Sequence, residues 1–195
     1  GHFLGDNVEK GPNLRRRYLL DSSLKLHAMT SNTFNHVISP HHYVNGVRVE
    51  STESFEVFSP IDQSLIARVA HASAAQVAEA VRAASAAFSA WSALTAADRK
   101  NLLYAFADEI GKRKEAFCDV ESADAGVLRS RMAHGVVKRA MLNITHFADA
   151  ALTLQNRTLE TAQAMHHIHH DPAGVCAIIT PWNAPLMLAT WKVGP

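Results

Sequence analysis

Residues 174–185 read Gly174-Val175-Cys176-Ala177-Ile178-Ile179-Thr180-Pro181-Trp182-Asn183-Ala184-Pro185, and they indicate the fold class. Its first part, 174–180, is a continuous apolar run bounded by glycine and proline, which is typical of a buried parallel strand. The turn Pro181–Pro185 leads into a predicted helix over 186–193, with Pro185 in its first turn. A strand, a tight turn and a helix open a βα unit of a doubly wound domain. The sequence therefore predicts an α/β fold in which ligands bind at the carboxyl ends of the strands.

Short strands are predicted on the amino-terminal side of this unit. Tyr43–Val49 places Asn45-Gly46 between β-forming residues, which is the strongest short signal for a hairpin. Residues 55–58 and 65–69 predict two more strands around a turn at Ser59–Asp62, and Met165–His170 predicts another just before the βα unit.

Four helices are predicted between these strands. Ser73 and Gln76 form an S-x-x-Q capping box, Thr95 caps a second helix, and Gly126 ends a third helix over 114–124. A fourth, long helix is predicted over 130–154. We expect the apolar faces of the first, second and fourth helices to pack in the core. In that order, the faces consist of Val77, Ala80, Val81, Ala84, Phe88 and Trp91; Leu102, Leu103, Phe106 and Ile110; and Val136, Val137, Ala140, Ile144, Phe147 and Ala151.

The composition excludes several classes of protein. The 19 Lys and Arg residues balance 18 Asp and Glu residues, and a net charge of +1 argues against a basic nucleic-acid-binding face. Two cysteines, Cys118 and Cys176, lie too far apart for a CxxC zinc site or a disulfide scaffold. No apolar run reaches the roughly 18–20 residues of a membrane span, and residues 1–6 do not resemble a secretory signal. The default expectation is a soluble, cytoplasmic protein.

Residues 1–40 differ from the rest of the chain, because they show neither a helical nor a strand period. We expect a tail that is disordered or that was added upstream of a native start near Met29. The run Arg15–Arg17 is interpreted as part of a solvated tail, with a phosphate or nucleic-acid patch as the alternative.

Asn183 is the residue to which position and chemistry point most directly. It stands between a predicted buried strand and a helix N-terminus, where the helix dipole favours negative charge. Its side-chain NH₂ could donate to a developing oxyanion, a role worth about 2.7–4 kcal/mol per donor. The alternative is a turn residue that hydrogen-bonds its own backbone. The residues by themselves leave both possibilities open.

The chain closely resembles the aldehyde dehydrogenase superfamily. The likeness rests on the segment G-V-x-x-x-I-x-P-W-N-x-P at 174–185, followed by W-K-x-x-P at 191–195. It extends back through the motif Glu121–Gly126 and the preceding helices to about residue 42. Within the superfamily, the strings around Cys176 and Lys192 resemble hydroxymuconic-semialdehyde dehydrogenases most.

This resemblance implies NAD(P)-dependent oxidation of an aldehyde to a carboxylic acid through a cysteine thioester. Asn183 matches the asparagine that stabilises the oxyanion, and Thr180, Pro181 and Trp182 match positions that line the pocket of the cofactor, NAD or NADP. The implied partners are a small-molecule aldehyde and further copies of the chain, in a homo-oligomer that is a dimer or tetramer, with no nucleic acid, no membrane and no metal.

The resemblance also implies a domain plan. Residues 41–164 would form an amino-terminal arm and the helical part of the cofactor domain. Residues 165–170 would form a linking and oligomerisation strand, and residues 171–195 would start the dinucleotide-binding domain with the first βα unit of a Rossmann-like parallel sheet.

Several expected parts of the family pattern are not found. The nucleophilic cysteine, the general-base glutamate and the glycine-rich cofactor turn belong after Pro195, and Gly126-Val127-Leu128 replaces the usual G-K-P. Cys118 is predicted on an inner helix face and Cys176 in a buried strand, so both are expected to be inert core thiols. We therefore expect these 195 residues to be inactive alone.

Two other functions remain open. The chain could be a non-catalytic, truncated subunit that pairs with full-length copies through its unpaired apolar strand at 174–180. The cluster His166–His170 could bind a metal, although same-face imidazoles in a strand stand about 7 Å apart and lack an acidic or thiolate partner. A structural strand with exposed imidazoles is the simpler interpretation.

Overall fold

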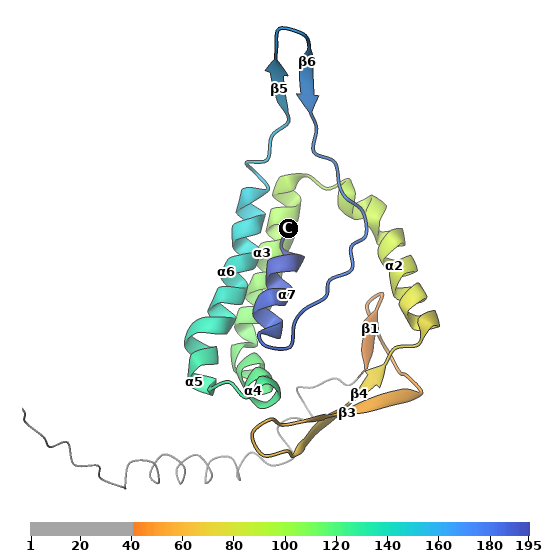
Figure 1. Cartoon of the computed structure of the whole chain (residues 1–195), viewed down its shortest axis with the longest axis vertical. Helices are drawn as coiled ribbons and strands as arrows, with labels where there is room; N and C mark the ends of the chain where they lie inside the picture. Colours follow the sequence, from red (N-terminus) through yellow and green to blue (C-terminus); the bar gives the residue numbers. More distant parts are fainter. Residues whose placement is uncertain (1–40) are drawn as a thin grey trace, which may run out of the picture. The chain divides into compact units, whose positions relative to one another are not determined.

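The computed structural model describes residues 41–195, coloured in Figure 1. The predictions for the tail 1–40, with Arg15–Arg17 and the start near Met29, lie outside the described residues. Two antiparallel hairpins come first, as expected from the sequence. Strands β1 (His42–Val44) and β2 (Val47–Val49) meet at Asn45 and Gly46, whose φ angles of 50° and 80° are those of a tight hairpin turn.

The second hairpin pairs β3 (Glu53–Phe58) with β4 (Leu65–His71), and its register shifts between Val57 and Phe58. Its bounds extend the predicted strands by a few residues. The turn between the two strands includes Ser59, whose backbone N–H donates to the carbonyl of Ser64 at 2.8 Å.

The helices begin and end where the local signals predict. Helix α2 (Ala74–Ser92) starts with the complete capping box of Ser73 and Gln76, and Thr95 caps α3 (Ala96–Lys112). Helix α4 (Lys114–Ala125) ends at Gly126, which has a left-handed φ of 67°.

The predicted long helix over 130–154 is interrupted and shorter. It consists of α5 (Arg129–Arg131), a π-helical turn η3 (Met132–Val136) and α6 (Val137–Ala150). A π-helical turn adds one residue to the helical turn, and Met132 and Val137, five positions apart, are consequently both buried.

Helix α6 is central to the helical layer, packing against α3 and against α7 (Pro185–Val193), as Figure 1 shows. The core lies around this contact. Its buried residues are Ala107, Ile110, Cys118, Met132, Val137 and Ile144.

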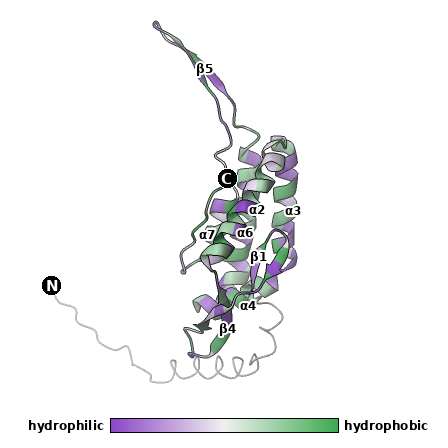
Figure 2. Ribbon diagram, turned by 90° about the vertical axis from the view of Figure 1, so that its right-hand side faces the viewer, coloured by the Kyte–Doolittle hydropathy of each residue, from purple (hydrophilic) through white to green (hydrophobic). Residues whose placement is uncertain are grey.

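The prediction of which residues of α2 and α3 are buried is partly wrong. On α3 the buried side chains are Ala107 and Ile110, because the core shared with α6 forms on that side of the helix, whereas Leu102 and Phe106 are exposed. Helix α2 buries no residue, and Val77, Val81 and Trp91 are exposed, since β1 and residues 175–177 cover that stripe only in part. Figure 2 shows hydrophobic residues on both helices.

A third hairpin pairs β5 (Arg157–Glu160) with β6 (Met165–Ile168). The predicted strand 165–170 is thus present but two residues shorter. Its partner β5 was not predicted, because Arg157-Thr158-Leu159-Glu160 has too few apolar residues to show an alternating pattern.

The predicted parallel strand at 174–180 is not formed. These residues take no part in a strand and are exposed, with Ile179 80% accessible. A strand needs a neighbour to receive its backbone hydrogen bonds, and β6, the strand before it, is paired with β5. The structure is therefore mixed α and β, while a Rossmann-like sheet is not seen in the described part of the chain.

Candidate functional site

Asn183 lies in the turn that leads directly into α7. The helix begins at Pro185, as predicted, and Ala184 is its N-cap residue. Asn183 is exposed, and its side chain makes no hydrogen bond to any residue within 41–195. The alternative of a turn asparagine bonded to its own backbone is thus not observed, and the side-chain NH₂ can donate to a ligand.

The three predicted cofactor-binding residues form an exposed approach to this turn. Thr180 and Pro181 are exposed, and the Trp182 side chain is 86% accessible. The ammonium of Lys192, near the end of α7, donates to the carbonyl of Ile179, so this segment is tied back to the helix that follows it. The structure places Thr180, Pro181, Trp182 and Asn183 in one continuous exposed segment.

Glu121 was not predicted as a site residue, although it contacts the start of α7. Its side chain is buried on α4, and its carboxylate accepts the backbone N–H of Leu186 at 2.7 Å. Burial raises the pKa of Glu121, the Leu186 N–H opposes this shift, and the negative charge of Asp124 adds to it. The sequence offered two signals: Glu121 opens the motif Glu121–Gly126, and it stands three residues after the buried Cys118, on the same helix face.

A second polar contact holds the middle of α7 against α6. The side-chain amide of Asn143 donates to the Thr190 hydroxyl at 3.2 Å and to the carbonyl of Met187 at 3.4 Å. Asn143 and Thr190 are both buried. Neither was predicted, because their partners lie more than 40 positions away in the sequence.

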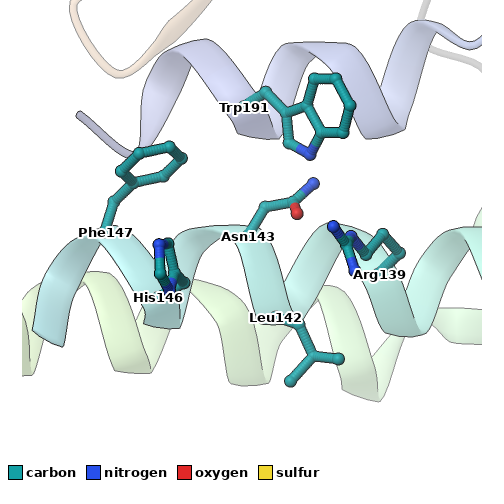
Figure 3. Close-up of a pocket in the computed structure, with 6 residues that line it drawn as sticks. All are labelled: Arg139, Leu142, Asn143, His146, Phe147 and Trp191. Carbon is teal, nitrogen blue, oxygen red and sulfur yellow. The ribbon is translucent and has the colours of Figure 1, made fainter. Parts of the chain in front are cut away.

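A pocket of about 550 Å³ opens between α6 and α7 (Figure 3). Figure 3 shows Trp191 projecting from α7 towards the side chains that α6 presents. The lining residues are Arg139, Leu142, Asn143, His146, Phe147 and Trp191. Within residues 41–195, Arg139 pairs with no carboxylate, so the pocket combines apolar walls with an uncompensated positive charge.

The two cysteines differ, contrary to the prediction. Cys118 is fully buried, and burial raises the pKa of its thiol, as expected of an inert core cysteine. Cys176 is exposed rather than buried, because the strand expected around it does not form. Its exposure removes the reason for expecting an inert thiol.

The histidine cluster is placed around β6, with His166 and His167 in the strand. The ring of His167 lies 3.0 Å from the Thr158 hydroxyl on β5. Across the described range, 41–195, no group of three or more His, Cys, Asp or Glu side chains is arranged to hold a metal ion. The helices in that range include none that is both long and apolar enough to cross a membrane.

Known proteins similar to this chain include semialdehyde dehydrogenases. The 2-aminomuconic 6-semialdehyde dehydrogenase of a Pseudomonas species is 37% identical over 159 residues, which cover 78% of this chain and 32% of the relative. The 2-hydroxymuconic semialdehyde dehydrogenase of Pseudomonas sp. strain CF600 is 36% identical over 162 residues, which cover 79% and 33%. The chain thus spans about one third of the length of these curated relatives.

Solved structures show the same likeness. The crystal structure of PnpE from Pseudomonas sp. WBC-3 matches with a TM-score of 0.74 and 36% identity, covering 80% of this chain and 33% of PnpE. The P. syringae indole-3-acetaldehyde dehydrogenase AldA, solved as a C302A mutant with NAD⁺ and IAA, matches with a TM-score of 0.77 and 28% identity, covering 89% and 35%. The model of the aldehyde dehydrogenase family matches residues 47–195, and the chain belongs to that family.

Proposed function

We propose that this protein takes part in oxidising an aldehyde to a carboxylic acid, with Asn183 as the oxyanion donor. The observation that supports this role is the exposed side chain of Asn183, which no described residue engages, at the entrance to α7. When a thiolate adds to an aldehyde carbonyl, negative charge develops on its oxygen. An amide N–H held beside a helix N-terminus stabilises that charge more than it stabilises the neutral carbonyl.

The segment before Asn183 fits a nicotinamide cofactor. Trp182 and Ile179 present large, exposed apolar surfaces beside the polar Thr180, and such a mixture suits a planar heterocycle attached to polar groups. Thr180, Pro181 and Trp182 would line the binding site, and NAD or NADP would serve as the hydride acceptor. Structures similar to this one, PnpE and AldA, have been solved with NAD.

The pocket between α6 and α7 supports a finer proposal on the substrate. Trp191 lies six residues after Pro185, the first residue of α7, or about 9 Å along the helix, and Asn183 stands two residues before Pro185. The pocket therefore lies within reach of the tail of a substrate whose carbonyl is at Asn183. The unpaired guanidinium of Arg139 suits a carboxylate on that tail. Similar proteins named as muconic semialdehyde dehydrogenases act on aldehydes of this acidic class.

The domain plan remains part of the proposal. Residues 41–164 would form the arm and helical layer, 165–170 a strand for linking and homo-oligomer formation, and 171–195 the start of the dinucleotide-binding domain. The protein would act in the cytoplasm as a dimer or tetramer.

The activity can be tested by following NADH at 340 nm with a panel of aldehydes. The protein expressed from its gene, from its own start codon to its own stop codon, is expected to form NADH. These 195 residues alone are expected to form none, because Cys118 is buried and the thiol of Cys176 donates to the carbonyl of Gly174 rather than to a general base. NADH formation by the 195 residues that is lost in Cys176→Ser would overturn the second expectation.

A non-catalytic subunit is the second candidate, and the exposed apolar side chains of Ile178 and Ile179 favour it. Such a surface would pair with a further copy of the family fold. Size-exclusion chromatography with light scattering tests this: a defined oligomer without NADH formation supports it, and a clean monomer contradicts it.

A further inference from the structure

Glu121 joins two elements that are far apart in the sequence. Its carboxylate on α4 accepts the N–H of Leu186 on α7, 65 residues later, at 2.7 Å. The Glu121 residue is only 6% accessible. A buried carboxylate is costly unless it is hydrogen-bonded, and here the donor is a backbone group at the beginning of another helix.

The start of α7 provides no cap of its own. The first N–H groups of a helix have no partner within the helix, and an N-cap side chain usually accepts one of them. The side chain of Ala184 at the N-cap position has no acceptor, and Pro185 has no N–H. Leu186 is thus the first helical residue whose N–H needs a partner, and Glu121 supplies it with a charge that the helix dipole favours.

We propose that Glu121 is the positioning residue for Asn183: by accepting the Leu186 N–H, it determines where α7 begins and thereby where the Asn183 amide stands. This inference rests on the proposed function, in which Asn183 donates to the oxyanion. Only Ala184 and Pro185 separate Asn183 from Leu186, and the proline ring restricts the backbone between them. On the other side, the contact of Lys192 with the Ile179 carbonyl limits the segment that leads to Asn183.

The chain offers a matched control on the same helix. Thr190 accepts from Asn143 and holds the middle of α7 to α6. Thr190→Val keeps the shape of the side chain, removes that acceptor and leaves the contact between Glu121 and Leu186 in place. If Glu121 positions Asn183 specifically, then loosening α7 at Thr190 does not reproduce the effect of losing Glu121.

The experiment uses the ¹⁵N-labelled protein expressed from its gene, without aldehyde or cofactor. Amide exchange reports on Leu186, and ¹⁵N relaxation reports the backbone order parameter at Asn183. In Glu121→Ala we expect exchange at Leu186 about tenfold faster, from the loss of a hydrogen bond to a charged group, and an order parameter at Asn183 below about 0.6. Glu121→Gln keeps a neutral acceptor and should restore both in part, whereas Thr190→Val should leave the order at Asn183 unchanged.

Unchanged order at Asn183 in Glu121→Ala, or an equal loss in Thr190→Val, would overturn the inference. If the alanine variant does not fold, Glu121→Asp keeps the charge but shortens its reach, and the same loss at Asn183 is expected. The readout is independent of catalysis. If Glu121→Ala loosens Asn183 but Asn183→Ala keeps full turnover in the protein expressed from its gene, the proposed function fails and the positioning role stands. If Asn183→Ala loses turnover but Glu121→Ala leaves the order of Asn183 unchanged, only the positioning role is rejected.

Discussion

The side-chain amide of Asn143 donates to the hydroxyl of Thr190 at 3.2 Å, and this pair joins α6 to α7 inside the protein. The Thr190 hydroxyl in turn donates to the carbonyl of Met187 at 2.8 Å, so the pair is also bound to the backbone of α7. The helix that follows the candidate oxyanion donor is therefore held by specific polar contacts as well as by apolar packing.

Replacing either residue of this pair should destabilise the protein, and the effects of the two replacements should not add. Asn143→Ala and Thr190→Val should each lower the free energy of unfolding by about 0.5–1.5 kcal/mol, because each removes the hydrogen bond between the two buried side chains. The double variant should cost less than the sum of the two, since both changes remove the same hydrogen bond. Urea unfolding of all four proteins measures this coupling. Exposed Asn101→Ala is the control and should change stability by less than about 0.5 kcal/mol. If the changes in unfolding free energy of the two single variants add up to that of the double variant, the contact between Asn143 and Thr190 is contradicted.

Two glycines should respond oppositely to alanine. Gly126 has a φ of 67°, and an added Cβ would lie 3.1 Å from the Pro60 ring, so Gly126→Ala should cost about 1–2 kcal/mol of unfolding free energy. Gly135 lies in η3 with nothing within 4 Å of an added Cβ. Because alanine is the better helix former, Gly135→Ala should stabilise the protein by up to about 1 kcal/mol. Thermal unfolding compares the two variants. Equal effects would show that the left-handed φ of Gly126 does not affect the stability.

The buried Glu121 should give stability a distinct pH dependence. Burial raises its pKa above the ordinary value of 4.5, so the folded state binds this proton more tightly than the unfolded state does. Its contribution to the free energy of unfolding is complete below about pH 4.5 and is lost as the pH rises through the raised value. Urea unfolding from pH 4 to 8 should therefore show a decline that Glu121→Gln removes. The surface variant Glu160→Gln should keep the decline. A curve of the same shape for all three proteins would contradict the raised pKa of Glu121.

Arg139 should give the protein a lower KM for an aldehyde that bears a carboxylate than for a neutral aldehyde. In the protein expressed from its gene, Arg139→Met should raise KM at least about tenfold for an aldehyde that bears a carboxylate, since a hydrogen-bonded charge pair is lost. For a neutral aldehyde of similar size, KM should stay within about twofold. Steady-state kinetics with both substrates makes this comparison, and Lys138→Met, on the same helix and outside the pocket lining, is its control. An equal rise in KM for both aldehydes would argue against an anionic tail in the pocket.

Signals contained within a few residues could be predicted from the sequence. The capping box of Ser73 and Gln76, the turn at Asn45-Gly46 and the helix end at Gly126 all appear where expected. Each depends on hydrogen bonds or backbone angles inside one short segment, so no distant partner can alter it.

Features that depend on distant partners could not be predicted in the same way. The hydrophobic run 174–180 has the pattern of a buried strand, but its exposure depends on whether another strand pairs with it. The apolar stripe of α2 is exposed for a related reason, because composition does not say what covers a face. At the site, the sequence indicated Asn183 through a short motif, whereas Glu121 and Asn143 act across 65 and 47 residues.

Asn183 is proposed to stabilise the oxyanion, and the turnover of Asn183→Ala measures this role. In the protein expressed from its gene, with a saturating aldehyde and NAD or NADP, kcat should fall by about 10²–10³, the loss typical of one oxyanion donor. KM should change little, because the ground-state carbonyl gains less from this hydrogen bond than the oxyanion does. Asn101→Ala on α3 should keep the wild-type kcat. A fall of less than about threefold in Asn183→Ala would contradict the role of Asn183.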